Sequence, residues 1–248
     1  MARGGGGAST QGWGEYLRYS FPSSSFTVTN AAIAGRSARS YTREGRFAAV
    51  AAAAGPGDWV VIEFGHNDGG GLGGSSGDNG RTDCFGDGSQ TCESVYDGQH
   101  DTVQTFPTYV KNATAMFLRT GAKVIISSAT PNNVWESGSF AWAPSRFDYY
   151  AWLAAAQSGG PGAGVYYVPH GAYAAQAMRN MGEAAVDAGY PKDHTHTSPA
   201  LADVMARSFV LGLRCGTSEL GAAVVNSTES LTSGFLGACI QANSSMPI

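Results

Sequence analysis

A four-residue motif near the C-terminal third of this chain carries the residue types that perform proton transfer. In Asp193-His194-Thr195-His196, a carboxylate precedes an imidazole by three residues. Histidine has an ordinary pKa of about 6.5, so it can accept a proton near neutral pH. An aspartate beside it can fix the ring's tautomer and stabilise its charged form. We therefore expect His196 to act as a general base and Asp193 to orient it.

Two other positions offer hydrogen-bond donors for a developing negative charge. Asn67 lies in Gly65-His66-Asn67-Asp68 after an apolar stretch, and Gly35 follows a second stretch. The Asn67 amide and the Gly35 backbone N–H can stabilise an oxyanion, and losing one such donor typically costs about 10²–10³ in rate. Together with a base, these groups indicate ester hydrolysis.

Each of these motifs also has a simpler interpretation. An Asp-x-x-His pair is more often a capping arrangement at a helix entry, and Gly, Asn and Asp all favour turns. Gly35 alone would serve to end a strand. Their consistent order along the chain favours the functional interpretation.

Metal binding is a weaker alternative. His194 and His196 are two residues apart, so on an extended chain their rings point the same way, as two metal ligands can. No third ligand is evident. The cysteines show no Cys-x-x-Cys spacing. We expect neither a metal nor a cofactor.

The elements that must position these residues alternate between strand and helix patterns. This alternation predicts an α/β fold with a largely parallel sheet. The predicted strands cover 25–33, 59–64, 123–128 and 165–168. The predicted helices cover 13–19, 43–54, 103–120, 146–158, 171–182 and 198–214. Residues 69–100 contain ten glycines and are expected to form a long structured surface loop.

The order of these elements places the polar motifs at one edge of the sheet. Ligands of a parallel sheet bind beyond the carboxyl ends of its strands, and Gly35 and Asn67 each follow such an end. The Asp193/His196 pair comes after the last strand–helix unit. With no repeat or linker, we expect one domain over 1–248, with an irregular tail from about residue 215.

Composition favours an extracellular, loop-rich protein. Of the 248 residues, 35 are glycine and only 14% are charged, against about a quarter in typical soluble domains. The net charge of -4 argues against nucleic acid as a partner. No apolar run approaches the roughly 20 residues that span a bilayer. The first 50 residues are nevertheless basic, and Arg39 is a candidate to bind carboxylates, with ordinary surface charge as the alternative.

The cysteines and glycosylation motifs also favour an extracellular protein. Four cysteines permit three pairings; the simplest is local, Cys84–Cys92 and Cys215–Cys239, and four free thiols are the alternative. Sequons for N-glycosylation begin at Asn112, Asn226 and Asn243. The chain nonetheless begins without a signal-peptide pattern. We expect a secreted protein whose natural start lies upstream.

Several longer stretches resemble the SGNH (GDSL-type) hydrolases, and within them the rhamnogalacturonan acetylesterases. They are 12–17, 34–47, 63–70, 78–84, 130–133 and 193–200. The resemblance implies a three-layer, flavodoxin-like fold with strand order 2-1-3-4-5. It implies an enzyme that removes acetyl esters from the galacturonate residues of an acidic polysaccharide without a cofactor. We expect a monomer. It also implies the two local disulfides, an oxyanion role for Gly35 and Asn67, and the Asp193–His196 pair.

One block of the family pattern is absent from the sequence. The family opens with a strand ending in Gly-Asp-Ser-Thr-Met-Ala, and Met1-Ala2 match only its last two residues. Ser9 aligns beyond that motif, and Ser37 and Ser40 are better placed to cap a turn. We therefore expect a truncated sequence that lacks the first, interior strand and the nucleophile, and is inactive as printed. The alternatives are a non-catalytic carbohydrate-binding relative, or an esterase acting on xylan or small acyl esters.

Overall fold

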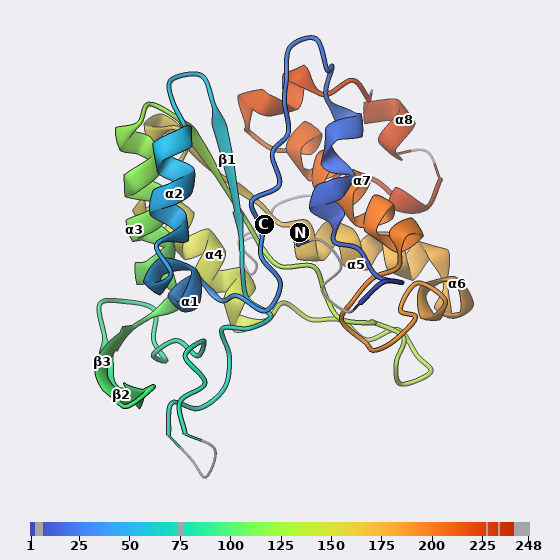
Figure 1. Ribbon diagram of the computed structural model, residues 1–248. Helices are drawn as coiled ribbons and strands as arrows, with labels where there is room; N and C mark the ends of the chain where they lie inside the picture. The colour runs from blue at the N-terminus through green and yellow to red at the C-terminus, as the bar shows by residue number, and fades with distance from the viewer. Residues whose placement is uncertain (3–6, 74–76, 227, 233, 241–248) are drawn as a thin grey trace. The chain divides into compact units, whose positions relative to one another are not determined.

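The structure is a computed structural model of the chain that describes residues 1–2, 7–73, 77–226, 228–232 and 234–240 (Figure 1). It divides into two compact units, each described by itself below. The first comprises Met1–Ala34, Thr130–Pro144 and Val168–Ile248, and the second comprises Gly35–Ala129 and Ser145–Tyr167. In the described part of the chain, no helix has the length and apolar character needed to cross a membrane.

The second unit contains the parallel sheet. Its strands β1 (Trp59–Glu63), β4 (Lys123–Ser127) and β5 (Val165–Val168) lie in the order β1-β4-β5. β1 and β4 pair in parallel. Val124, Ile125 and Ile126 are all at most 1% exposed, as expected for a parallel strand that is covered on both faces. The predicted α/β class is therefore confirmed, and so is the order of these three strands.

Four helices complete the core of the second unit. They are α1 (Ala38–Arg43), α2 (Arg46–Ala53), α3 (Phe106–Arg119) and α4 (Arg146–Gln157). Figure 1 shows α2 and α3 side by side, and α4 packs on β4. Phe47 of α2 packs against Phe117 of α3 in the aromatic core. Gly45 adopts φ +68°, which interrupts the helix predicted over 43–54 and separates α1 from α2.

The stretch predicted as one long loop, 69–100, contains the first strand of a hairpin, and the second strand includes the first two residues of the helix predicted over 103–120. β2 (Thr91–Tyr96) and β3 (Gln99–Gln104) pair antiparallel around Asp97-Gly98, which both have positive φ. Asp-Gly is a favoured two-residue hairpin turn. The strands are mostly polar and exposed, with Val103 as a fully buried exception, so they lack the apolar alternation that would have revealed them.

The first unit is built around α7 (Pro199–Cys215). Its other elements are η1 (Trp13–Glu15), η2 (Leu17–Ser20), α5 (His170–Met181), α6 (Glu183–Asp187), η4 (Glu219–Ala223), α8 (Thr228–Thr232) and η5 (Gly234–Leu236). Trp13 packs on His170 and Phe209, with ring centroids 4.8 Å apart in both pairs. Gly212 lets α7 approach α5, because a Cβ there would lie 3.1 Å from the Tyr173 ring.

Two predictions for the N-terminal residues are wrong. Residues 13–19 form two short 3₁₀ turns in place of one helix. Residues 25–33 are not assigned to a strand, although exposure alternates between half-buried and exposed side chains from 26 to 33. The sequence pattern by itself can produce this alternation of exposure. A strand also requires a neighbouring strand to which its backbone is hydrogen-bonded.

Both predicted disulfides are present. Cys84–Cys92 joins the segment before the hairpin to β2, and Cys215–Cys239 joins the end of α7 to the C-terminal segment. The described chain has no free cysteine.

Candidate active site

The Asp193/His196 pair lies in the first unit, in the irregular segment before α7. Nδ1 of His196 lies 2.8 Å from Oδ2 of Asp193, a hydrogen bond between the two side chains. The backbone N–H groups of Thr195 and His196 both donate to Oδ1 of Asp193, also at 2.8 Å. One oxygen of the Asp193 carboxylate thus accepts the two backbone hydrogen bonds that stabilise the turn, and the other oxygen binds the imidazole.

These contacts determine the charge and tautomer of the pair. The backbone N–H groups of His196 and Thr195 lower the pKa of Asp193 to about 2, with the His196 ring adding to the effect. An ionised Asp193 can only accept, so Nδ1 of His196 carries the proton that it donates, and in the neutral ring the lone pair is then on Nε2. The imidazole side chain is 41% exposed.

Neighbouring segments fix the turn that carries the pair. Asn133 N–H donates to the carbonyl of His194 (2.7 Å), and Thr195 Oγ1 donates to Asn132 (3.0 Å). On the other side, Gln11 N–H donates to the carbonyl of Thr197 at 2.9 Å, and Thr197 Oγ1 donates back to Gln11 at 2.8 Å. Sequence reasoning gave no positioning role to these residues, because the contacts join positions far apart in the chain.

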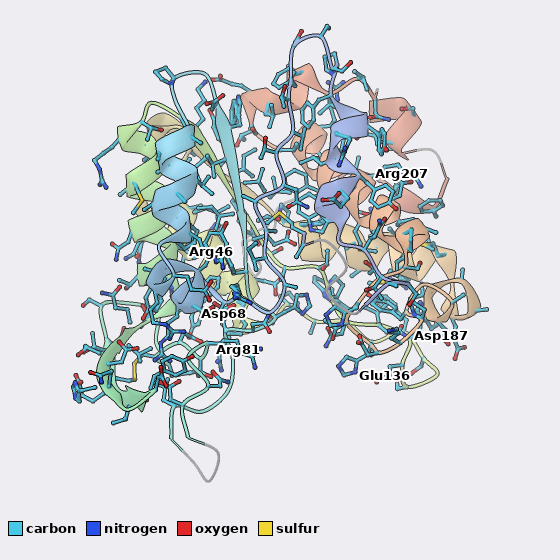
Figure 2. The ribbon with its side chains drawn as sticks, viewed as in Figure 1. Arg46, Asp68, Arg81, Glu136, Asp187 and Arg207 are labelled. Carbon is cyan, nitrogen blue, oxygen red and sulfur yellow. A yellow bond between two sulfur atoms is a disulfide. The ribbon has the colours of Figure 1, made fainter. Side chains whose placement is uncertain are left out.

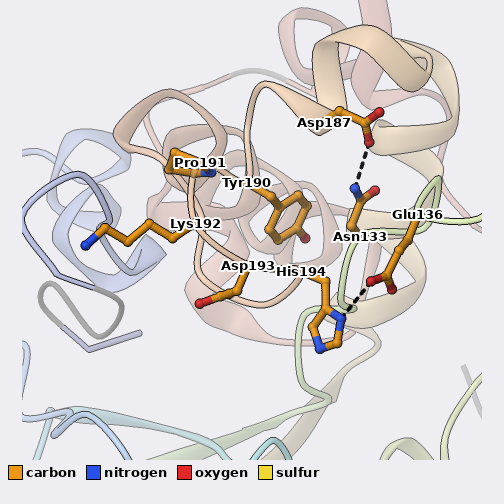
Figure 3. Close-up of a pocket in the computed structure, with 8 residues that line it drawn as sticks. All are labelled: Asn133, Glu136, Asp187, Tyr190, Pro191, Lys192, Asp193 and His194. Carbon is orange, nitrogen blue, oxygen red and sulfur yellow. Dashed lines mark hydrogen bonds and ion pairs between the residues drawn. The ribbon is translucent and has the colours of Figure 1, made fainter.

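A pocket of about 370 Å³ opens beside Asp193 (Figure 3). Its walls combine carboxylates, an amide, a histidine and a lysine: Asn133, Glu136, Asp187, Tyr190, Pro191, Lys192, Asp193 and His194. His194 pairs with Glu136 at 3.0 Å, and Asn133 donates to Asp187 at 2.7 Å. Such groups can accept and donate hydrogen bonds to hydroxyl-rich ligands.

The two predicted oxyanion donors belong to the second unit and lie close together. Nδ2 of Asn67 lies 3.4 Å from the carbonyl oxygen of Arg36, the residue after Gly35. Gly35 has φ +72°, a conformation that favours glycine, and no atom lies within 4 Å of where its Cβ would be. Glycine is therefore required here by backbone conformation and not by crowding.

Asp68 links the segments that carry both donors. One of its carboxyl oxygens accepts from the N–H of Ala38 at 2.7 Å, and the other accepts from the N–H of Gly65 at 2.9 Å. Complete burial raises the pKa of Asp68 to about 8, against the opposing effect of these N–H donors. Burial likewise raises the pKa of the neighbouring Asp83 to about 6.

Arg39 has a different role from the predicted one. Its side chain is only 1% exposed, and its guanidinium binds Asp78 (2.6 Å) and Asp101 (2.5 Å). Hydrogen bonds from Arg39 and Ser94 lower the pKa of Asp78 to about 2, although burial alone would raise it. A buried, doubly paired guanidinium is unavailable to a polysaccharide, so the proposed substrate contact is wrong.

Arg81 is the basic side chain that lies beside the donors. Its Nη1 donates to Oδ1 of Asn67 at 3.1 Å, and Figure 2 shows Arg81 in the same region of the second unit as Asp68. The sequence contained no signal that singled out Arg81 among its neighbours. Within the described ranges, no group of three or more His, Cys, Asp or Glu side chains is arranged to hold a metal.

Comparison with known proteins identifies the family. Residues 1–209 match the family of GDSL-like lipases and acylhydrolases. A rhamnogalacturonan acetylesterase of Emericella nidulans is 54% identical over 208 residues, which cover 84% of this chain and 80% of that protein. A probable rhamnogalacturonan acetylesterase of Bacillus subtilis, YesY, is 40% identical over 57 residues, 23% of this chain and 26% of that protein.

A solved structure supports the fold. The crystal structure of the protein YxiM from Bacillus subtilis matches with a TM-score of 0.64 at 18% identity and covers 85% of this chain. This chain spans about half of that protein, 51% of its length. The sequence match over most of the chain and the close relative lead to one conclusion: the chain belongs to the GDSL-like lipase and acylhydrolase family.

Proposed function

We propose that this protein is an esterase that removes acetyl groups from rhamnogalacturonan, an acidic polysaccharide of pectin. The 54% identical relative supports the substrate class. The single observation that supports the chemistry best is the 2.8 Å contact between Nδ1 of His196 and the ionised Asp193. It leaves Nε2 of the neutral ring as the base for activating an alcohol.

In the proposed reaction, a serine hydroxyl attacks the acetyl carbonyl carbon while Nε2 of His196 takes its proton. Hydrogen-bond donors stabilise the resulting oxyanion, which is the role that the family resemblance predicts for the Gly35 N–H and the Asn67 amide. Collapse breaks the bond to the sugar oxygen, which takes the proton from His196 and leaves as an alcohol. Water then attacks the acetyl-serine, again with His196 as base, and releases acetate.

We assign no serine of the printed sequence as the nucleophile, because none lies in a Gly-Asp-Ser motif. Ser37 is fully buried and forms a capping box with Ser40 at the start of α1, so both are occupied as caps. A second candidate function, a carbohydrate-binding relative that keeps the site without turnover, is tested beside the first.

Acetate release from acetylated rhamnogalacturonan fragments separates the two candidates. The assay compares the printed chain with a version that carries a strand ending in Gly-Asp-Ser-Thr directly before Met1. We expect release from the extended version, and a loss of at least about 10³-fold in its His196→Gln variant. His100→Gln is the matched control, because His100 is exposed on β3.

Binding of the fragments without acetate release from either version would support the binding relative. Acetate release from acetylated xylan or 4-nitrophenyl acetate, but not from rhamnogalacturonan fragments, would refute the substrate assignment.

We further propose that the protein is a secreted, glycosylated monomer. Two disulfides support an oxidising compartment. Asn112 is exposed on α3 and is the best placed acceptor, whereas Asn226 is half-buried and Asn243 lies outside the described residues. Asn112→Gln should remove one glycan's mass from protein secreted by a eukaryotic host, and size-exclusion chromatography with light scattering tests the monomer.

A further inference from the structure

The second unit contains several arginines whose side chains are candidates to bind an anionic ligand. Most are already engaged: Arg36 and Arg46 with Glu44, Arg39 with Asp78 and Asp101, and Arg43 over the ring of Tyr96. Arg81 is half-buried, and among the described residues its guanidinium contacts no carboxylate. Its one side-chain hydrogen bond within the described residues is to the Asn67 oxygen.

That contact sets the orientation of the Asn67 amide. An arginine donates only, so the group that faces Nη1 of Arg81 must be the amide oxygen, Oδ1. The amide NH₂ of Asn67 then points away from Arg81, to the side of the Arg36 carbonyl. An oxyanion donor must present N–H groups, so Arg81 holds Asn67 in the useful orientation.

The turn that carries Arg81 is rigidly held by the buried Arg39. Nη1 of Arg39 donates both to Asp78 at 2.8 Å and to the carbonyl of Thr82 at 3.0 Å, the two ends of the turn. Between these ends, the N–H of Arg81 donates to the side chain of Asn79 at 2.8 Å. The guanidinium of Arg81 is therefore presented from a fixed backbone, which lowers the entropic cost of binding a ligand.

We propose that Arg81 is the specificity-determining residue for an acidic sugar, binding a uronate carboxylate while it positions the Asn67 amide. This inference rests on the proposed function. With Nη1 on Asn67, the edge formed by Nε and Nη2 remains for a carboxylate, which matches that planar fork with two charge-assisted hydrogen bonds. A uronate seated there lies next to the donor for the ester oxyanion.

The test uses the full chain and two probes that differ only in charge. One is a de-esterified rhamnogalacturonan oligosaccharide, and the other is the same oligosaccharide with its carboxyl groups reduced to alcohols. Isothermal titration calorimetry measures both affinities. We expect the wild type to prefer the acidic probe by roughly 10- to 100-fold, and Arg81→Gln to lose that preference. Arg81→Lys should keep only part of it, because lysine lacks the fork.

A second readout needs no ligand and follows Asn67 directly. The side-chain NH₂ resonances of Asn67, assigned with Asn67→Ala, should shift in Arg81→Gln. Arg119→Gln is the matched control, an exposed arginine in the last turn of α3, and it should leave both readouts unchanged. Unfolding midpoints for all variants separate local effects from loss of fold.

The outcomes distinguish this inference from the proposed function. Equal wild-type affinity for both probes, or an unchanged preference in Arg81→Gln, refutes the carboxylate contact and leaves the acetylesterase proposal intact. Unshifted Asn67 resonances refute the positioning role. If neither oligosaccharide binds and no acetate is released from the acetylated fragments by either version of the chain, the proposed function fails and this inference fails with it.

Discussion

Replacing Asp68 by asparagine keeps the shape of a buried side chain and removes its ability to ionise. The carboxyl accepts two backbone hydrogen bonds, from Ala38 and from Gly65, at 2.7 and 2.9 Å. Asparagine can accept one of them with its oxygen and turns its NH₂ group toward the other donor. An unsatisfied buried donor costs about 1–3 kcal/mol, so at pH 5 we expect Asp68→Asn to be less stable than the wild type by this amount.

The pH dependence should change in the opposite direction. Because burial raises the pKa of Asp68 from 3.8 to about 8, the folded state holds a proton that the unfolded state releases. The stability from this group is complete below about pH 4 and is lost as pH rises toward 8. The loss is roughly 1.4 kcal/mol per pH unit, or about 4 kcal/mol from pH 5 to pH 8. Asparagine removes this loss, so the variant should equal or exceed the wild type at pH 8.

Urea denaturation between pH 5 and pH 8 measures this difference in the free energy of unfolding. Asp83 also has a raised pKa and adds to the raised pKa of Asp68, so the difference between the two proteins measures Asp68 together with its interaction with Asp83. Asp87→Asn is the control, since Asp87 is exposed and should leave the pH profile unchanged. A difference between wild type and Asp68→Asn that stays constant from pH 5 to pH 8 would refute the raised pKa.

Three further outcomes are expected. Arg39→Met should lower the free energy of unfolding by about 3–5 kcal/mol, because it leaves Asp78 buried and unpaired; a loss below 1 kcal/mol in urea denaturation would contradict the buried ion pair. His196→Gln should leave the urea midpoint unchanged, because the ring is 41% exposed; a large shift would show that the imidazole is structural. Replacing Cys215 and Cys239 by serine should cost about 3 kcal/mol from the loop that the bridge closes, and an unchanged thermal midpoint would contradict this.

Local features of this chain were predictable from its sequence. The turn around Asp193 needs only a carboxylate and the next three residues, so their spacing identified the contact with His196. The apolar run of β4 is long enough to identify a buried parallel strand. Ser198 and Pro199 likewise identified the start of α7, where Ser198 accepts from the N–H of Leu201.

Features that depend on distant partners were not predictable. The environment of Arg39 is set by carboxylates 39 and 62 residues away, and no local pattern shows that a charged side chain will be buried. Residues 25–33 have the alternation of a strand, but pairing is decided by other parts of the chain. The sequence pattern indicated a turn at Asp68. Its hydrogen bond from the N–H of Ala38 joins residues 30 positions apart, so no local pattern shows it.

The reciprocal contacts between Gln11 and Thr197 have a practical consequence for handling the protein. They tie the opening residues of the chain to the backbone adjoining the imidazole. A protease cut, an affinity tag or an antibody that displaces the backbone near Gln11 will therefore loosen the segment that carries the His196 imidazole without contacting the ring. Preparations that differ only at the amino terminus should be compared with this linkage in mind.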